Sequence, residues 1–167
     1  MKYGAADWIE RFEMNPHPEG GYYKEVYRSE TVIPAEALPA CFGASRNCCT
    51  SIYYLLERGN FSAFHRMRQD EIWHVYDGGP IRIHLLLDGG ASQGMLLGRT
   101  PERDGVPQGV VPGGCWFAAE PVEEADFVLV GCTVSPGFDF ADFELARRVD
   151  LIASYPEQEA LVRRLTL

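Results

Sequence analysis

Hydrophobic and polar residues alternate in short runs through most of this chain, a pattern that is typical of β-strands. Between residues 48 and 134 such runs follow one another, separated by glycine-rich turns such as Gly78-Gly79-Pro80 and Pro112-Gly113-Gly114. The runs span residues 48–57, 60–67, 70–77, 80–87, 93–98, 107–112, 115–120 and 127–134. Short strands at this spacing predict an antiparallel sandwich or barrel.

Helical spacing is found near the two ends of the chain. Trp8 and Phe12 lie four residues apart in the segment 5–13, so one helix face carries both rings. From about residue 142 the pattern is helical again, and Asp142 is the expected N-cap of the helix that follows it. A second helical segment has Pro156 in its first turn. The prediction is an all-β domain spanning residues 1–167, with a short N-terminal helix and C-terminal helices.

Composition and charge narrow the choice of partners. The chain has 167 residues and a formal net charge of -9, which opposes binding to nucleic acid or to an anionic membrane. Its first residues contain no apolar leader, and no segment approaches the ~18 apolar residues of a membrane span. The five cysteines are an odd number without a C-x-x-C pair. We therefore expect a cytoplasmic protein with free thiols.

One segment, residues 59–78, carries the most informative motif of the chain. Gly59, His65, Glu71 and Gly78 have the spacing G-x5-H-x-M-x3-E-x6-G. This spacing resembles the first motif of the cupin β-barrels, in which a second histidine stands where this chain has Met67. The resemblance implies a double-stranded β-helix, the jelly-roll barrel of the cupins, as a single domain.

A second motif of the cupins is found at residues 112–117, where P-x-G is retained and Phe117 replaces a histidine. The resemblance implies a site of three histidines and one glutamate for a divalent metal, of which His65 and Glu71 remain. The thioether of Met67 is a poor ligand for the metals concerned. We therefore expect no cofactor, and a divalent metal, if one is bound, would be held by His65 and Glu71.

The residues that remain predict an apolar cup around a histidine and a carboxylate. Alternation along the strand puts His74 on the face opposite Glu71. A His65–Glu71 pair in a dry cup is suited to proton abstraction next to a carbonyl, with His65 as the base. This indicates a metal-independent isomerase or epimerase acting on a sugar-like or carbonyl compound. The alternatives are a non-catalytic barrel that binds or senses a metabolite, a residual metal enzyme, and a pair that is only a leftover polar core.

The segments PHPEGGYY (16–23) and PGFDFADFELA (136–146) make the resemblance more specific. Together with the central motif, they resemble a cupin family of unknown function over residues 8–165. The resemblance implies a barrel similar to that of the dTDP-sugar 3,5-epimerases, paired as a homodimer. Those enzymes use a histidine base, which His65 would match, and a tyrosine acid. The tyrosines available for that role are Tyr22, Tyr23, Tyr53 and Tyr54.

The strand predicted at 22–29 offers further binding groups. Arg28 is a candidate clamp for an anion, and the alternative is a salt bridge to Glu25. Alternation puts Tyr22 and Arg28 on one face and Tyr23 on the other, and the sequence leaves open which face looks inward. His17, between two prolines, is interpreted as structural or solvent-facing. The predicted ligand-binding residues are Met67, Trp73, Phe117, Arg28, Tyr22 and Tyr54.

Overall fold

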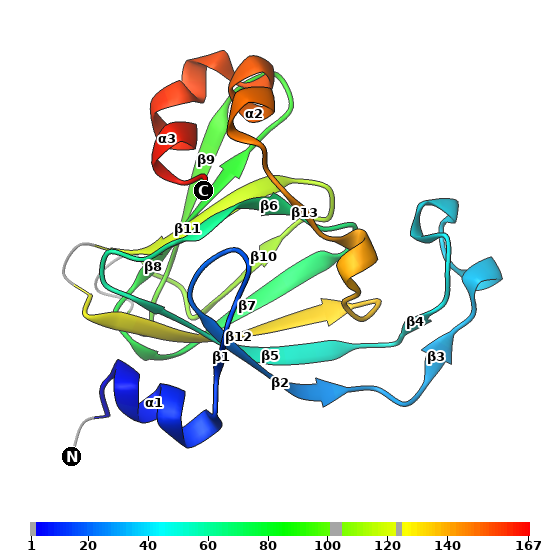
Figure 1. Cartoon of the computed structure of the whole chain (residues 1–167), viewed down its shortest axis with the longest axis horizontal. Coiled ribbons are helices and arrows are strands. Elements are labelled where there is room, and N and C mark those ends of the chain that lie inside the picture. Colours follow the sequence, from blue (N-terminus) through cyan, green and yellow to red (C-terminus); the bar gives the residue numbers. More distant parts are fainter. Residues whose placement is uncertain (1–2, 101–104, 123–124) are drawn as a thin grey trace.

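Two antiparallel sheets face each other and enclose the core of the protein (Figure 1). The computed structural model describes residues 3–100, 105–122 and 125–167. The first sheet has the order β1 (Asn15–Pro16), β2 (Tyr22–Arg28), β5 (Thr50–Glu57), β12 (Phe127–Ser135), β7 (Asp70–Gly78) and β10 (Gln108–Val111). The second has the order β13 (Glu144–Leu145), β6 (Ser62–Arg66), β11 (Trp116–Pro121), β8 (Ile81–Leu86) and β9 (Ser92–Leu97). The predicted all-β fold is confirmed.

Alternation along the strands determines which side chains enter the space between the sheets. In β7, Glu71, Trp73 and Val75 are buried, whereas Ile72 and His74 lie on the other face and are partly exposed. The prediction that His74 points away from Glu71 is therefore confirmed. Each large apolar side chain buried in this way contributes roughly 1.5–3 kcal/mol of hydrophobic stabilisation.

The N-terminal helix covers the outer face of the six-stranded sheet. This helix, α1 (Ala5–Phe12), stacks the rings of Trp8 and Phe12 with their centroids 5.2 Å apart, as their spacing predicted. Phe12 in turn stacks on Tyr53 of β5 at 4.4 Å, so the helix packs on the sheet through aromatic contacts.

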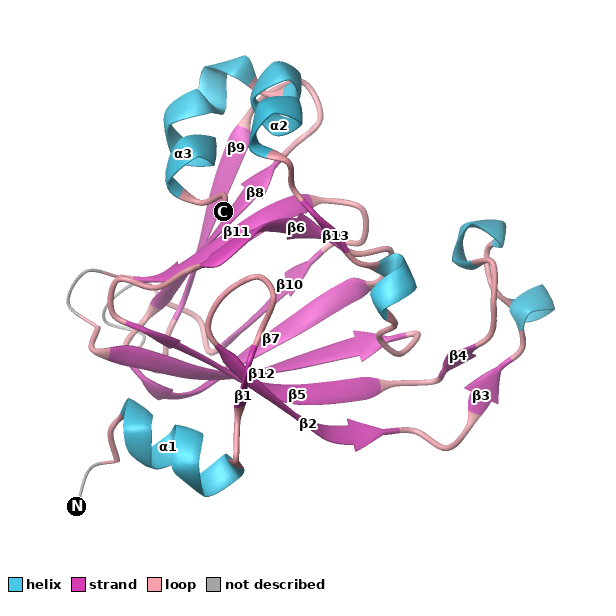
Figure 2. Cartoon of the chain, viewed as in Figure 1, coloured by secondary structure: helices cyan, strands magenta, loops and turns pink. Residues whose placement is uncertain are grey.

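The C-terminal helices α2 (Arg148–Ser154) and α3 (Glu159–Arg164) cover the outer face of the five-stranded sheet (Figure 2). Leu151 and Val162 pack there against Phe64 of β6. A 3-10 turn, η5 (Pro156–Gln158), joins the two helices and has Pro156 in its first turn, as predicted. No helix in the described ranges is long and apolar enough to cross a membrane.

An arm leaves the barrel between β2 and β5 (Figure 1). Its base is the two-stranded pair of β3 (Val32–Ile33) and β4 (Arg46–Asn47). Its outer part contains two 3-10 turns, η1 (Ala35–Ala37) and η2 (Ala40–Phe42). The arm brings Arg46 back to the barrel beside the segment that follows β12.

The segment after β12 differs from the sequence prediction. It forms a 3-10 turn, η4 (Phe140–Asp142), and then β13, so that helix α2 begins only at Arg148. The cap of η4 is Asp139, whose Oδ1 accepts a hydrogen bond from the backbone N–H of Ala141 at 2.8 Å. The prediction of Asp142 as a helix N-cap is wrong, because its carboxylate is bound to Arg46 instead.

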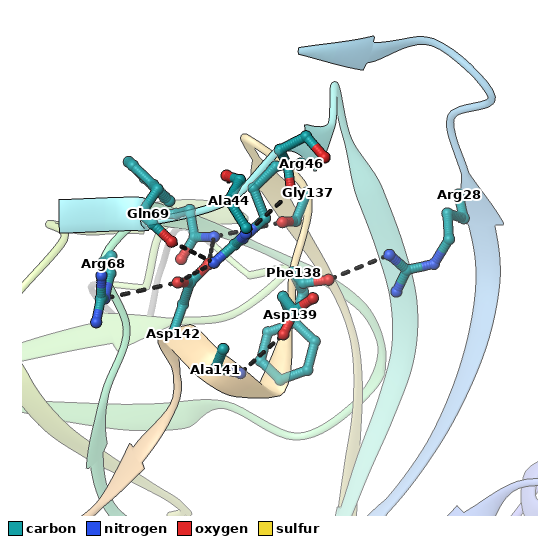
Figure 3. Close-up of polar contacts among 12 residues, drawn as sticks. Arg28, Ala44, Arg46, Arg68, Gln69, Gly137, Phe138, Asp139, Ala141 and Asp142 are labelled. Atoms are coloured by element: carbon teal, nitrogen blue, oxygen red, sulfur yellow. Dashed lines mark hydrogen bonds and ion pairs between the residues drawn. The ribbon is translucent and has the colours of Figure 1, made fainter. Parts of the chain in front are cut away.

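Arg46 and Asp142 form a bidentate ion pair that is almost inaccessible to solvent (Figure 3). The N–O distances are 2.7 and 2.6 Å, and the Gln69 amide donates a further bond of 2.8 Å to Asp142. Burial would raise the pKa of Asp142, but the hydrogen bonds from Arg46 and Gln69 outweigh it and lower that pKa. The pair joins the arm to the segment 138–143.

Removing one charge of this pair is expected to destabilise the protein strongly. Asp142→Asn leaves the Arg46 guanidinium buried without a counter-ion, so the free energy of unfolding should fall by roughly 3–5 kcal/mol. Urea unfolding at neutral pH measures the change. The matched control is Asp150→Asn, which breaks an exposed ion pair with Arg147 and should change stability by less than about 1 kcal/mol. Equal stability of the two variants would contradict the role given to the buried pair.

Candidate functional site

A cavity of about 550 Å³ opens between the two sheets. The turn before β2 contributes to its lining, together with β2, β5, β6, β7, β12 and the segment 138–143. Its size is within the range of small-molecule sites. The buried lining residues that carry most of its polar and aromatic character are Glu19, Tyr54, His65, Met67, Glu71 and Trp73.

Most of the predicted site residues meet at this cavity. His65, Met67 and Glu71 line it, and so does Trp73. Phe117 is buried beside His65, with ring centroids 4.1 Å apart, but it is not among the side chains that line the cavity. It therefore supports the histidine ring from the neighbouring strand β11, where Phe117 pairs with His65 in register.

On strand β2, the structure brings Arg28 to the cavity and leaves Tyr22 outside it. Tyr22 packs under helix α1 with Leu55, whereas Tyr23 lines the cavity. Simple alternation grouped Arg28 with Tyr22, and that grouping is wrong. The pairing of β2 with β5 shifts register between Glu25 and Tyr27, which moves Arg28 to the inward face.

The guanidinium of Arg28 is largely occupied by protein acceptors. It donates to both carboxylate oxygens of Glu25, at 3.0 and 2.7 Å, and to Asn47 Oδ1 at 3.0 Å. A fourth bond of 3.2 Å goes to the carbonyl oxygen of Phe138 (Figure 3). Hydrogen bonding to Glu25 also raises the pKa of Arg28. Of the two alternatives predicted for Arg28, an anion clamp and a salt bridge to Glu25, the contacts are those of the salt bridge.

Glu19 is a buried carboxyl in the cavity that sequence reasoning missed. It precedes Gly20 and Gly21, which have φ values of 112° and 68° that few side chains tolerate. A Cβ at Gly20 would collide with the carbonyl oxygen of Phe61, so the turn approaches the barrel closely enough to insert Glu19. The Ser62 hydroxyl donates to Glu19 Oε1 at 2.8 Å.

His17 also lines the cavity, so of the two interpretations the solvent-facing one is wrong. Its side chain is nearly buried, and Nδ1 lies 3.6 Å from Glu19 Oε2. Burial lowers the pKa of His17, although the charge of Glu19 partly offsets that effect. The signal available in the sequence was a histidine and a glutamate two residues apart, ahead of a double glycine.

Both ring nitrogens of His65 contact polar groups of the protein. Nδ1 lies 2.8 Å from the carbonyl oxygen of Ala63, which can only accept, so we assign the hydrogen to Nδ1. Nε2 lies 3.1 Å from Glu19 Oε2. Glu19 is thus a direct neighbour of His65 that the sequence did not predict, whereas Glu71, the predicted partner, acts on the pKa of His65 through its charge. Burial lowers the pKa of His65 and raises that of Glu19, which favours a neutral pair with the proton on Glu19.

Glu71 and Trp73 present unpaired polar atoms on the same face of β7. Glu71 Oε2 and Trp73 Nε1 make no close hydrogen bond within the described part of the chain, although the Trp73 indole and the Cys132 thiol lie near enough to Glu71 to lower its pKa. Both side chains line the cavity. The two residues are only 7% and 1% exposed. Buried polar groups are almost always hydrogen-bonded, so an acceptor and a donor left free together indicate a ligand site.

Burial also changes the acidity of Glu71. It raises the pKa of this carboxyl from 4.5 to about 7. Protonation of His65 opposes this effect, and ionisation of the Glu19 carboxyl reinforces it. A carboxyl with this pKa exists in both protonation states near neutral pH. It can therefore accept and return a proton.

The donor set does not fit the divalent metal that the motif of residues 59–78 implies. Over residues 3–100, 105–122 and 125–167, no group of three or more histidine, cysteine, aspartate or glutamate side chains is arranged to hold one. His65 directs its Nδ1 to a carbonyl oxygen and its Nε2 to Glu19, so neither nitrogen is offered to an ion. Met67 and Phe117 supply no suitable ligand at the two remaining positions.

Comparison with known proteins gives a family and several relatives. Residues 6–146 match the model of the family described as Cupin superfamily (DUF985). Over 152 residues the chain is 33% identical to the uncharacterized protein YML079W of Saccharomyces cerevisiae. This match covers 85% of this chain and 75% of the yeast protein.

Solved structures with the same architecture include two of high similarity. The protein SO0799 of Shewanella oneidensis has a TM-score of 0.88 at 38% identity, covering 99% of this chain and 98% of its own. A hypothetical protein of Leishmania major has a TM-score of 0.87 at 35% identity, covering 98% and 99%. Oxalate decarboxylase of Bacillus subtilis, with a TM-score of 0.53 and 16% identity over 90% of this chain and 36% of the enzyme, shares the fold alone.

The raised pKa of Glu71 predicts how stability depends on pH. Between pH 4.5 and about 7 the folded state keeps a proton on Glu71 that the unfolded state has lost. Stability at this site therefore falls as pH rises, by about 3 kcal/mol in total, and the loss is complete above the folded pKa. Glu71→Gln removes the loss, so the variant should gain stability over the parent near pH 8 and not near pH 4.

Urea unfolding of both proteins at several pH values measures this difference. The matched control is Glu144→Gln, which removes an exposed carboxylate on the outside of the barrel and should produce no such pH-dependent gain. A constant difference between the Glu71→Gln variant and the parent from acid to alkaline pH would contradict the raised pKa.

Proposed function

Because this chain belongs to the family described as Cupin superfamily (DUF985), we propose that its barrel binds a small carbonyl compound and transfers a proton on it without a metal. The activity would be that of an isomerase or epimerase. The observation that carries the proposal is a carboxyl oxygen of Glu71 and the indole N–H of Trp73 in one cavity, neither of which has a close hydrogen-bond partner in the described part of the chain. A carbonyl compound with an adjacent C–H group needs both.

In the proposed step, the ionised Glu71 carboxylate removes a proton from the carbon next to the carbonyl. The C–H bond breaks, an O–H bond forms on Glu71, and the electron pair moves onto the carbonyl oxygen. The indole N–H of Trp73 donates a hydrogen bond to that oxygen, where negative charge develops. Return of the proton to the former carbonyl carbon, while the proton of the adjacent hydroxyl passes to the former carbonyl oxygen, gives an isomer. An epimer forms if water protonates the opposite face of the same carbon and Glu71 releases its proton to water.

His65 takes a supporting role in this scheme. Its two ring nitrogens are occupied by Ala63 and Glu19, so Glu71 is a better candidate for the base. Protonation of His65 lowers the pKa of Glu71 and ionisation of Glu19 raises it, so a change in the protonation of the His65–Glu19 pair adjusts the acidity of the base. We therefore propose them as positioning residues.

Aromatic side chains around the cavity support a flat or ring-shaped ligand. Tyr54 is buried in the lining, and Phe138 and Phe143 face it from the segment after β12. Rings of this kind stack on planar ligands. The Tyr54 hydroxyl donates to the carbonyl oxygen of Gly20 at 2.7 Å, so this tyrosine contributes its ring rather than an acid group.

We also propose that two copies of the chain associate along β2. One edge of β2 pairs with β5, whereas β1 covers the other edge only at Tyr22 and Tyr23. Beyond that point, Val26 and Tyr27 are 48% and 54% exposed. An open apolar edge strand is a ready template for pairing with a second chain.

Proton transfer is tested by deuterium exchange in D₂O. The parent protein should catalyse exchange of the protons next to the carbonyl of dihydroxyacetone or 2-hydroxyacetophenone, measured by proton NMR. Glu71→Gln should abolish the exchange because it removes the base. Trp73→Phe keeps a large ring but loses the N–H, and the rate should fall about 10²-fold.

The control for these variants is Glu144→Gln, whose exposed carboxylate lies outside the cavity and should leave exchange unchanged. If the Glu71→Gln variant exchanged at the parental rate, the proposed role of Glu71 would be wrong. Binding of these compounds without any exchange would instead favour a barrel that carries or senses its ligand.

Association of two copies is tested by light scattering after size-exclusion chromatography. The parent should elute as a dimer, and Val26→Lys should shift it to the monomer because a charge on the edge strand opposes pairing. Val149→Lys is a matched control, since Val149 is exposed on helix α2, away from β2. A monomeric parent would contradict the proposal.

A further inference from the structure

We infer that the ligand of the cavity carries a positively charged nitrogen, as in a protonated amine or amidine, and not a phosphate or carboxylate. The inference rests on the proposed function in one respect, because it takes the same cavity as the ligand site. What carries it is the juxtaposition of a buried carboxyl without a counter-ion, an excess of acidic side chains and several aromatic faces in one cavity.

Acidic groups outnumber basic ones in the lining of the cavity. Its carboxyls are those of Glu19, Glu25, Glu71 and Asp139, and its guanidinium is that of Arg28. The bidentate bonds between Arg28 and Glu25 cancel one charge of each sign. The remaining lining residues that the structure describes include no lysine and no second arginine.

The two histidines of the lining do not balance this excess. Burial lowers the pKa of both His17 and His65, which favours their neutral forms. Glu19 Oε2 contacts His65 Nε2, and burial raises the pKa of Glu19, which favours its neutral form. The carboxylate left without a counter-ion is Glu71, which takes part in no ion pair of the described residues.

An unpaired buried carboxylate makes the cavity selective for charge. Ionising a buried carboxyl is costly unless a cation or hydrogen-bond donors accompany it. A cationic ligand would supply that partner for Glu71, whereas an anion would add repulsion from both Glu71 and Asp139. In the protein without a ligand, this cost appears as the raised pKa of Glu71, because burial disfavours the charged form of its carboxyl.

The aromatic faces of the cavity favour the same sign of charge. Trp73 and Tyr54 lie in its buried part, and Phe138, Phe140 and Phe143 line it from the segment after β12. The faces of such rings carry negative electrostatic potential and attract ammonium and amidinium groups within about 6 Å. Rings combined with carboxylates therefore suit a cationic nitrogen.

The same residues argue against a nucleotide-linked sugar as the ligand. Recognition of phosphate groups uses free arginine or lysine side chains that donate several hydrogen bonds at once. In this cavity Arg28 already donates four hydrogen bonds to Glu25, Asn47 and Phe138, which leaves one of its five N–H groups. The likeness to the dTDP-sugar epimerases therefore does not extend to the ligand.

Three planar probes of nearly equal shape test the charge preference. Benzamidinium is positive, benzamide is neutral and benzoate is negative, and titration calorimetry near pH 8 measures the affinity of each. Benzamidinium should bind at least about tenfold more tightly than benzamide, a difference of about 1.4 kcal/mol, with benzoate the weakest. If benzoate bound as tightly as benzamidinium, or if none of the three bound, the inference would be overturned.

Glu71→Gln identifies the carboxylate responsible. The variant should lose about tenfold in affinity for benzamidinium and should bind benzamide within about twofold of the parent. Glu144→Gln makes the same change in net charge outside the cavity and should leave both affinities unchanged. A parallel loss for all three probes in the Glu71→Gln variant would overturn the inference, and thermal unfolding establishes that each variant is folded.

The probes contain no carbon-bound proton next to a carbonyl that Glu71 could remove. Selective binding of benzamidinium would therefore support the inference even if deuterium exchange on the ketones failed. Exchange on a neutral ketone without preference for benzamidinium would support the proposed function and overturn the charge inference. The two failures are thus distinguishable.

Discussion

The ion pair between Arg46 and Asp142 positions the segment 138–143, which forms the aromatic wall of the cavity. Arg46 reaches the barrel from the arm, and Asp142 belongs to the segment that contributes Phe138, Phe140 and Phe143 to the lining. The pair is buried and bidentate, so it fixes the direction of that segment as well as its distance from the barrel. Without it, the aromatic wall would lack its main polar attachment to the rest of the structure.

The alternation of residues was sufficient to predict an antiparallel sandwich or barrel and the orientation of β7, and helical spacing predicted the terminal helices. Along that strand, side chains two residues apart share a face, and Glu71 and Trp73 could be placed together from the sequence. The same rule failed on β2, because a register shift after Glu25 turned Arg28 inward. A register shift depends on the pairing with the neighbouring strand, so it cannot be predicted from the periodicity of one strand alone.

Glu19 and Asp142 could not be placed from the sequence for a related reason. Their positions depend on partners far away in the chain, Glu19 on Ser62 and His65, and Asp142 on Arg46. Asp142 had a local interpretation as a helix cap, and tertiary contacts overrode it. Glu19 had no local pattern that placed it in the barrel. The contact of His65 with Glu19 was missed for the same reason, because Glu19 comes from another segment.

The double glycine before β2 has a consequence for which substitutions this protein can accept during evolution. Apolar residues between the sheets can be exchanged for others of similar volume at modest cost. Gly20 has no such freedom, because any Cβ there would meet the carbonyl oxygen of Phe61. Tolerance to mutation should therefore be uneven. The apolar positions of the strands should accept many substitutions, whereas the turn that inserts Glu19 should accept very few.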